Sequence, residues 1–191
     1  METNSIYLES VKKQMLYYKT IGEKAMDQLE PEQLFSSVNE DTNSIAVIVK
    51  HMSGNMLSRW TDFLTTDGEK QWRNRDGEFE NSNDTKEELL KIWNNGWDCF
   101  FNAIQSLLPE QLSQIIYIRN EGQTAMDAIN RQLAHYPYHI GQIVFYAKML
   151  KQSEWNSLSI AKNKSNNYNA DKFSKEKSLK HFTDDELDKL Q

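Results

Sequence analysis

Apolar residues recur at intervals of three and four positions in four long segments of the chain. This spacing places them along one face of an α-helix. The segments cover approximately residues 5–29, 44–64, 84–108 and 124–150. Of the seven glycines and three prolines, half fall between these segments. Because amphipathic helices bury their apolar faces best against one another, the pattern predicts an all-α fold, a four-helix bundle.

Local signals mark the boundaries of the predicted helices. Pro31 ends the first, Thr124 caps the fourth, and Asp84-Thr-Lys-Glu87 has the spacing of a capping box for the third. Residues 111–120 alternate polar and apolar side chains, which fits a short strand. The polar residues 65–83 form a long crossover between the second and third helices. Long ordered connections are often functional.

The end of the chain differs in composition from the rest. Residues 151–191 hold 8 basic and 7 acidic residues, whereas residues 1–150 hold 14 and 21. The end also has few large apolar residues and many Asn, Lys and Ser. We therefore expect a helical domain at 1–150 and a polar C-terminal tail at 151–191. The tail is predicted to be irregular except for a short helix at Thr183–Leu190.

Composition and charge narrow the class of protein. The chain of 191 residues has a net charge of −6, which argues against binding nucleic acid or an anionic membrane through bulk charge. Its longest apolar run, Ile45–Val49, is far too short to span a membrane, and no signal-peptide pattern opens the chain. The single cysteine, Cys99, excludes an intramolecular disulfide and fits a reducing compartment. We therefore expect a cytoplasmic protein.

Three of the four histidines form a candidate metal site. His135 and His139 are four positions apart in the fourth helix, so their rings lie roughly 40° apart on one face. His51 lies beside the apolar stripe of the second helix, and ligands from facing helices converge inside a bundle. Three imidazoles leave open positions on a divalent ion, as in catalytic sites. The alternative is that these are ordinary core or surface histidines. Pro137, which lies between His135 and His139, either kinks the helix at the site or is simply tolerated there.

The order of these residues resembles a known family. His51, a long gap and then His135-Tyr-Pro-Tyr-His139-Ile-Gly-Gln142 is similar to the DinB-like superfamily, whose members are regarded as metalloenzymes. The resemblance covers about residues 1–150 and is greatest to an uncharacterised bacterial branch. It implies a four-helix bundle with a crossover between helices 2 and 3, three histidine ligands and a homodimer. The family's usual Arg before Gly-Gln is replaced here by Ile140.

The resemblance implies a range of activities. Relatives include transferases and isomerases that use low-molecular-weight bacterial thiols, and others are described as hydrolases. A divalent metal, zinc or nickel before other first-row ions, would lower the pKa of a thiol or of water and so provide a nucleophile. A small-molecule substrate follows from either reaction. The alternatives are a non-catalytic bundle that binds metal or a small ligand, and a dimeric stress-response module without metal.

Three residues near the predicted site have two interpretations each. Asn55, one turn after His51, could reach a metal-bound ligand or form an interhelical hydrogen bond. Arg59, a further turn along, could bind an anionic substrate through both guanidinium nitrogens or pair with Asp62. Gln142 could orient an imidazole or lie as a buried amide in the core.

The crossover contains a dense group of charges at residues 69–78. Arg73 and Arg75 lie in it and could bind substrate if the crossover folds over the mouth of the bundle. The alternative is a solvated loop held by local ion pairs.

Overall fold

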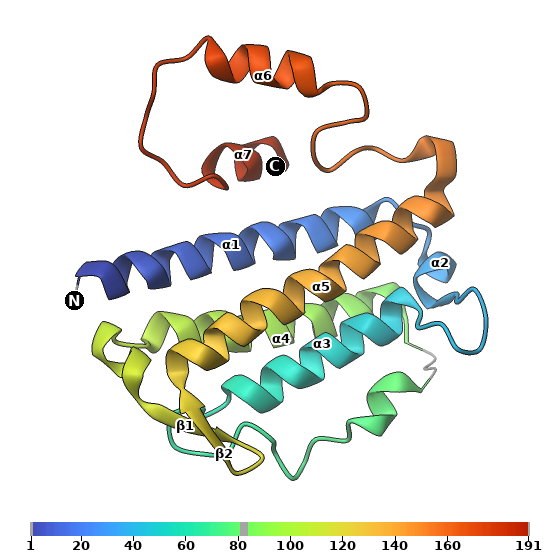
Figure 1. Ribbon diagram of the computed structural model, residues 1–191. Helices are drawn as coiled ribbons and strands as arrows, with labels where there is room; N and C mark the ends of the chain where they lie inside the picture. The colour runs from blue at the N-terminus through green and yellow to red at the C-terminus, as the bar shows by residue number, and fades with distance from the viewer. Residues whose placement is uncertain (1, 81–83, 191) are drawn as a thin grey trace.

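Four long helices lie side by side and form the body of the protein (Figure 1). In this computed structural model the structure describes residues 2–80 and 84–190, so positions 81–83 of the predicted crossover lie outside it. The long helices are α1 (Glu2–Asp27), α3 (Ile45–Trp60), α4 (Lys86–Ser106) and α5 (Ala125–Lys151). Helix α3 packs against α4 and α5, and α1 packs against α5 and α4. The chain is therefore mostly helical, as predicted.

Shorter elements connect these helices. They are α2 (Pro31–Phe35), the 3₁₀ helices η1 (Asp76–Phe79), η2 (Pro109–Ser113) and η3 (Gln152–Glu154), the strands β1 (Ile115–Ile118) and β2 (Glu121–Thr124), and the tail helices α6 (Ser165–Phe173) and α7 (Asp184–Leu190). None of the helices in the described ranges combines the length and apolar character that a membrane span requires.

The helix boundaries differ from the predicted ones in two places. Helix α4 is capped by Thr85 and Glu88, one residue after the predicted pair. The Thr85 hydroxyl accepts from the Glu88 N–H (3.2 Å) and donates to the Glu88 carboxylate (3.1 Å), whereas an Asp at this position could only accept. Helix α3 ends at Trp60 rather than near Leu64, because Asp62 adopts a left-handed backbone conformation with φ of 48°.

An aromatic cluster fills the core between the long helices. Trp93, Trp97, Phe100 and Tyr136 are each at most 1% exposed. Edge-to-face contacts join them, with ring centroids 5.6–6.0 Å apart. Tyr136 is the neighbour of His135 on α5, so the rigid core holds the segment of α5 that carries the histidines. Helix α5 continues through Pro137 to Lys151.

The predicted strand is half of a hairpin that is tied to the start of the crossover. β1 and β2 pair antiparallel around Arg119 and Asn120, whose φ angles of 55° and 62° suit a two-residue turn. The carboxylate of Asp67 accepts from both turn N–H groups at 2.8 Å, and the N–H of Gly68 donates to the Tyr117 carbonyl (2.8 Å). The residues that follow α3 are therefore held against the hairpin.

The C-terminal tail returns along α1 (Figure 1). Lys13 forms an ion pair with Asp184 (2.7 Å), and the Ser10 hydroxyl lies 3.1 Å from His181 Nε2. This contact leaves His181 only partly exposed. Helix α6 was not predicted from the sequence because it buries no residue and so has no apolar stripe.

Candidate metal centre

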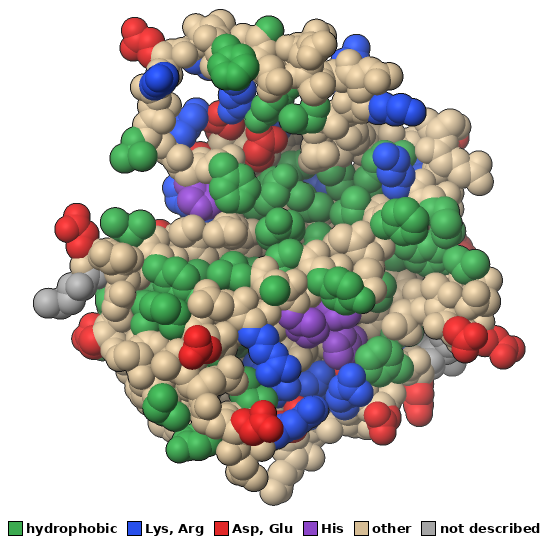
Figure 2. Space-filling view, viewed as in Figure 1, with side chains coloured by type: hydrophobic (Ala, Val, Ile, Leu, Met, Phe, Trp, Pro, Cys, Tyr) green, Lys and Arg blue, Asp and Glu red, His purple; other side chains and the backbone are tan. Residues whose placement is uncertain are grey.

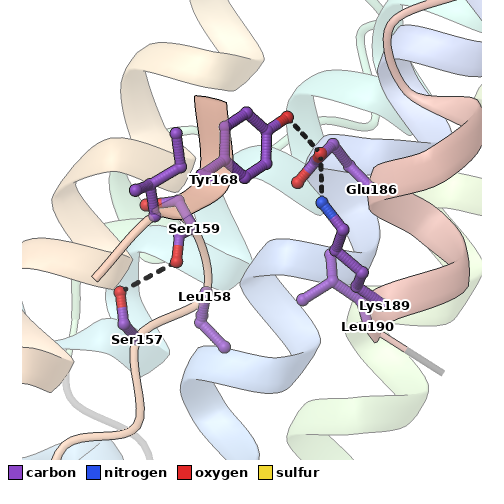
Figure 3. A pocket seen from close by; sticks show the side chains of 8 residues that line it. Ser157, Leu158, Ser159, Tyr168, Glu186, Lys189 and Leu190 are labelled. Atoms are coloured by element: carbon purple, nitrogen blue, oxygen red, sulfur yellow. Dashed lines mark hydrogen bonds and ion pairs between the residues drawn. The ribbon is translucent and has the colours of Figure 1, made fainter. Parts of the chain in front are cut away.

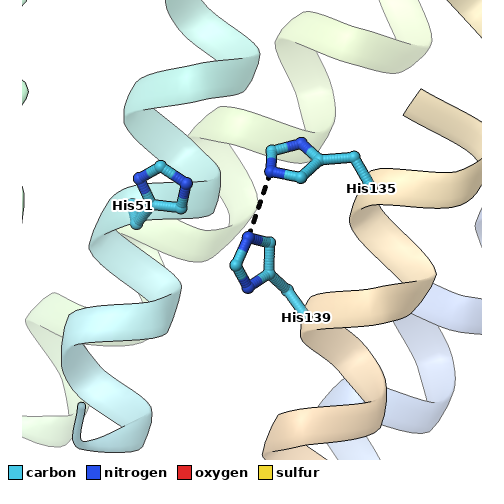
Figure 4. A group of neighbouring side chains, drawn as sticks. All are labelled: His51, His135 and His139. Atoms are coloured by element: carbon cyan, nitrogen blue, oxygen red, sulfur yellow. Dashed lines mark hydrogen bonds between the residues drawn. The ribbon is translucent and has the colours of Figure 1, made fainter. Parts of the chain in front are cut away.

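Helices α3 and α5 bring the three predicted histidines together. One ring nitrogen from each of His51, His135 and His139 lies within 4.8 Å of the others. Figure 4 shows the His51 ring extending from α3 toward the two rings of α5. His51 is 7% exposed and the other two are partly exposed. Figure 2 shows histidine side chains at the surface, so the site is open to solvent on one side.

Each histidine donates a hydrogen bond from Nδ1 to an oxygen of a neighbouring side chain. The acceptors are Glu78 Oε2 for His51 (3.0 Å), Gln132 Oε1 for His135 (3.0 Å) and Gln142 Oε1 for His139 (2.8 Å). The Gln142 amide is oriented by its own Nε2, which donates to Tyr138 Oη (3.1 Å). Because Nδ1 carries the proton, Nε2 of each neutral ring keeps a free lone pair, the state of a metal ligand.

The separation of two of these lone pairs fits a shared cation. His135 Nε2 and His139 Nε2 are 3.1 Å apart (Figure 4). Two neutral nitrogens that both lack a proton cannot form a hydrogen bond with each other. Two nitrogens that bind one zinc ion at about 2.0–2.1 Å would be roughly 2.9–3.4 Å apart, depending on the coordination angle. The residues present therefore fit a divalent metal.

The local electrostatics favour the neutral form of the two imidazoles on α5, His135 and His139. Burial, followed by the neighbouring histidines and by Arg131 and Arg59, lowers the pKa of His135 to about 4. Burial also lowers the pKa of His139. The hydrogen bond with Gln142 raises this pKa, but burial has the larger effect. Neutral rings are the form that binds a metal.

Glu78 was not identified from the sequence, although it orients His51. It lies in η1, and Arg73 donates to it from Nε (2.7 Å) and from a terminal nitrogen (2.9 Å). Burial raises the pKa of Glu78, but the hydrogen bonds from His51 and Arg73 outweigh burial and lower it. Gly54 makes room for this carboxylate, because a Cβ there would lie 2.1 Å from Glu78 Oε1. An ionised carboxylate behind a ligating histidine is a common feature of metal sites.

Asn55 and Arg59 bind protein partners. Asn55 Oδ1 accepts from the hydroxyl of Tyr136 (3.1 Å), which is an interhelical hydrogen bond between α3 and α5. Arg59 pairs with Glu69 (3.1 Å) rather than with Asp62, because Asp62 lies outside the helix and the helical spacing no longer applies.

The two crossover arginines lie on the α3 side of the histidines. The side chain of Arg73 is 2% exposed and holds Glu78, so this part of the crossover is more than a solvated loop. The guanidinium of Arg75 lies 5.4 Å from the ring centre of Phe79, and that ring is 5.0 Å from the ring of His51. Gln132 was also missed, although it precedes His135 by three positions, the same helical spacing that separates His139 and Gln142.

Removal of the Glu78 carboxylate is expected to weaken metal binding. We expect Glu78→Ala to lower the affinity for zinc about 10- to 100-fold, the usual cost of losing a partner behind a ligand. Glu78→Gln keeps an acceptor for His51 and should retain most of the affinity. Zinc titration by calorimetry measures both effects. Glu80→Ala removes the same charge from an exposed position nearby, and equal losses in the Glu80 and Glu78 variants would contradict the role of Glu78.

A separate cavity lies within the tail, away from the histidines. It has a volume of about 270 Å³ and is lined by residues 157–160, α6 and α7. Figure 3 shows that its charged groups are already partnered, since Tyr168 donates to Glu186 (2.9 Å) and Lys189 pairs with the same carboxylate (2.7 Å). We therefore assign no function to this cavity.

Comparison with known proteins places the chain in a family. The family described as "Protein of unknown function (DUF1572)" matches residues 2–164, a stretch that contains all three histidines of the candidate site. No curated protein and no solved structure matches the chain. Because the match covers most of the sequence, the chain belongs to this family.

Proposed function

We propose that this protein is a metal-dependent enzyme of the DinB-like type, in which His51, His135 and His139 hold a divalent ion. The observation that carries the proposal is the arrangement of the three rings. The Nδ1 atom of each ring forms a hydrogen bond with a side-chain oxygen. The other nitrogens of the three rings lie close together between α3 and α5. A structural metal site would be closed by four protein ligands, whereas three histidines leave positions for other molecules.

The chemistry proposed for the site is activation of a nucleophile. A divalent ion, zinc or nickel, would lower the pKa of a low-molecular-weight thiol or of water, which supports thiol transfer or hydrolysis. Glu78, Gln132 and Gln142 fix the orientation of the ligating rings. The thiol of Cys99 is unsuited as the nucleophile, because burial raises its pKa. The nucleophile is therefore proposed to come from outside the chain.

The finer architecture belongs to the same proposal. The four long helices, the crossover between α3 and α4 and the histidines on α3 and α5 support a four-helix bundle of the DinB-like type. We also propose that the protein is cytoplasmic and forms a homodimer. The second candidate, a non-catalytic bundle that binds metal or a small ligand, uses the same three histidines.

Metal analysis tests the proposed site. Protein purified without a polyhistidine tag is expected to contain, or to take up from zinc or nickel solutions, about one ion per chain. Mass spectrometry of the native protein and elemental analysis measure this stoichiometry. A chain that contains no metal and takes up none would overturn the proposal.

Activity assays then separate the enzyme from the binding protein. We expect a panel of small thiols with electrophilic acceptors, or of esters and amides, to contain a substrate whose turnover depends on the metal. A protein that binds metal at full stoichiometry and turns over no member of the panel would favour the non-catalytic bundle.

A further inference from the structure

A second cavity lies between the β-hairpin and the two helices that carry the histidines. Its volume is about 260 Å³, and three arginines line it: Arg59 of α3, Arg119 of the hairpin turn and Arg131 of α5. Among the residues that the structure describes, Glu121 is the only acidic one on its wall. We call this cavity the arginine pocket.

The arginines of the pocket are only partly paired with carboxylates. Arg59 and Arg119 share one oxygen of Glu69, each at 3.1 Å, while Arg73 is 3.8 Å from the other oxygen. In the described part of the chain, Arg131 has no carboxylate within 4.0 Å. Two of the three pocket arginines therefore share a single carboxylate, and the third has none beside it.

Arg59 also has a donor that lacks an acceptor. Its side chain is only 6% exposed, and one terminal nitrogen donates to the Gly68 carbonyl and to Glu69. Its Nε has no hydrogen-bond partner among the described residues. Buried donors are normally satisfied, so this one is an exception, but the atom is enclosed by protein and does not itself contact a molecule in the cavity.

The arginine pocket adjoins the histidines. Arg131 precedes His135 by four residues on α5, a rise of about 6 Å along the helix. Figure 2 shows a group of basic side chains directly beside the histidines on the same face of the molecule. One small molecule could therefore occupy the pocket and reach the histidines.

We propose that the arginine pocket binds an oxyanion, a carboxylate or a phosphate, of the molecule whose other end reaches the three histidines. The planar guanidinium offers paired donors that match the two oxygens of either group. The substrate class is thus a small anionic compound. The link to the histidines rests on the proposed function, whereas the oxyanion site does not require a metal.

Titration of the metal-free, full-length protein with inorganic phosphate and with acetate tests the pocket. At low ionic strength we expect saturable binding of at least one of them, followed through the arginine Nε–H signals by NMR. Arg131→Gln should weaken this binding at least 10-fold. The anion that binds more tightly identifies the group as phosphate or carboxylate. No saturable binding of either anion, or equal affinities in Arg131→Gln and the wild type, would overturn the pocket.

A matched control variant and a zinc titration show whether the loss of anion binding is specific to the arginine pocket. Lys148→Gln removes one positive charge from an exposed position of the same helix, outside the pocket, and is expected to leave the anion affinity unchanged. If Lys148→Gln lost as much anion affinity as Arg131→Gln, the loss would be explained by net charge alone, and the proposed binding site would be overturned. Arg131→Gln should still bind zinc at the wild-type stoichiometry, because all three histidines are unchanged. Failure of the wild type to bind zinc would overturn the proposed function and not the oxyanion site.

Discussion

The substitution His135→Ala is expected to abolish zinc binding while it leaves the helical content unchanged. His135 offers one of three converging nitrogens, so its loss should cost more than the about 10- to 100-fold that removal of an outer partner costs. Alanine is the most favourable residue in a helix, so α5 should persist. Calorimetric zinc titration and far-ultraviolet circular dichroism of the same sample measure both effects.

The same substitution should remove the thermal stabilisation by zinc. At a free zinc concentration 1,000 times Kd, binding stabilises the folded wild type by about 4 kcal/mol. For a chain of this size that corresponds to a rise in Tm of about 8–16 °C. His181→Ala is the matched control, because His181 lies in the tail and contacts Ser10 rather than the other histidines. Unchanged zinc affinity in His135→Ala would contradict the site.

The substitution Gly96→Ala is expected to destabilise the contact between α3 and α4. A Cβ at Gly96 would lie 2.7 Å from Ser53 Cα and 2.9 Å from its hydroxyl, and the first of these atoms belongs to the backbone of α3. The two helices must then separate, at a cost of about 1–3 kcal/mol. Ser53 is two residues from His51, so zinc affinity should fall as well. Urea unfolding of the metal-free protein and zinc titration measure the two changes.

Gly141→Ala is the matched control for this packing effect. Gly141 is also inside a helix, but a Cβ there would meet nothing within 4 Å apart from its chain neighbours and the backbone of its own helix. We expect this change to stabilise the protein by about 0.5–1 kcal/mol, because glycine in a helix is unfavourable relative to alanine. If both variants were destabilised equally, close packing at Gly96 would not be the cause.

The sequence predicted the features that depend on helical periodicity. The four long helices follow from apolar spacing, and the close approach of His135 and His139 follows from their separation by four positions. His51 required a further step, because only the packing of α3 against α5 brings it to the other two. The apolar stripes of both helices supported that packing, and the family resemblance supported it independently.

The sequence did not predict contacts that depend on the path of irregular segments. Glu78 reaches His51 from a short 3₁₀ turn, and no periodic rule relates positions 51 and 78. The pairing of Arg59 with Glu69 depends on the backbone turn at Asp62. These contacts arise from tertiary structure, which local spacing does not encode.

The ion pairs around Glu78 connect the metal centre to the arginine pocket. Hydrogen-donating side chains and carboxylates alternate along His51, Glu78, Arg73, Glu69 and Arg59, with successive separations of 3.0, 2.7, 3.8 and 3.1 Å. An anion that draws Arg59 away from Glu69 leaves this carboxylate freer to attract Arg73, which weakens the hold of Arg73 on Glu78. Free-energy coupling between two binding sites is reciprocal. If both proposed sites bind their ligands and these contacts couple them, occupation of either site changes the affinity of the other by the same factor.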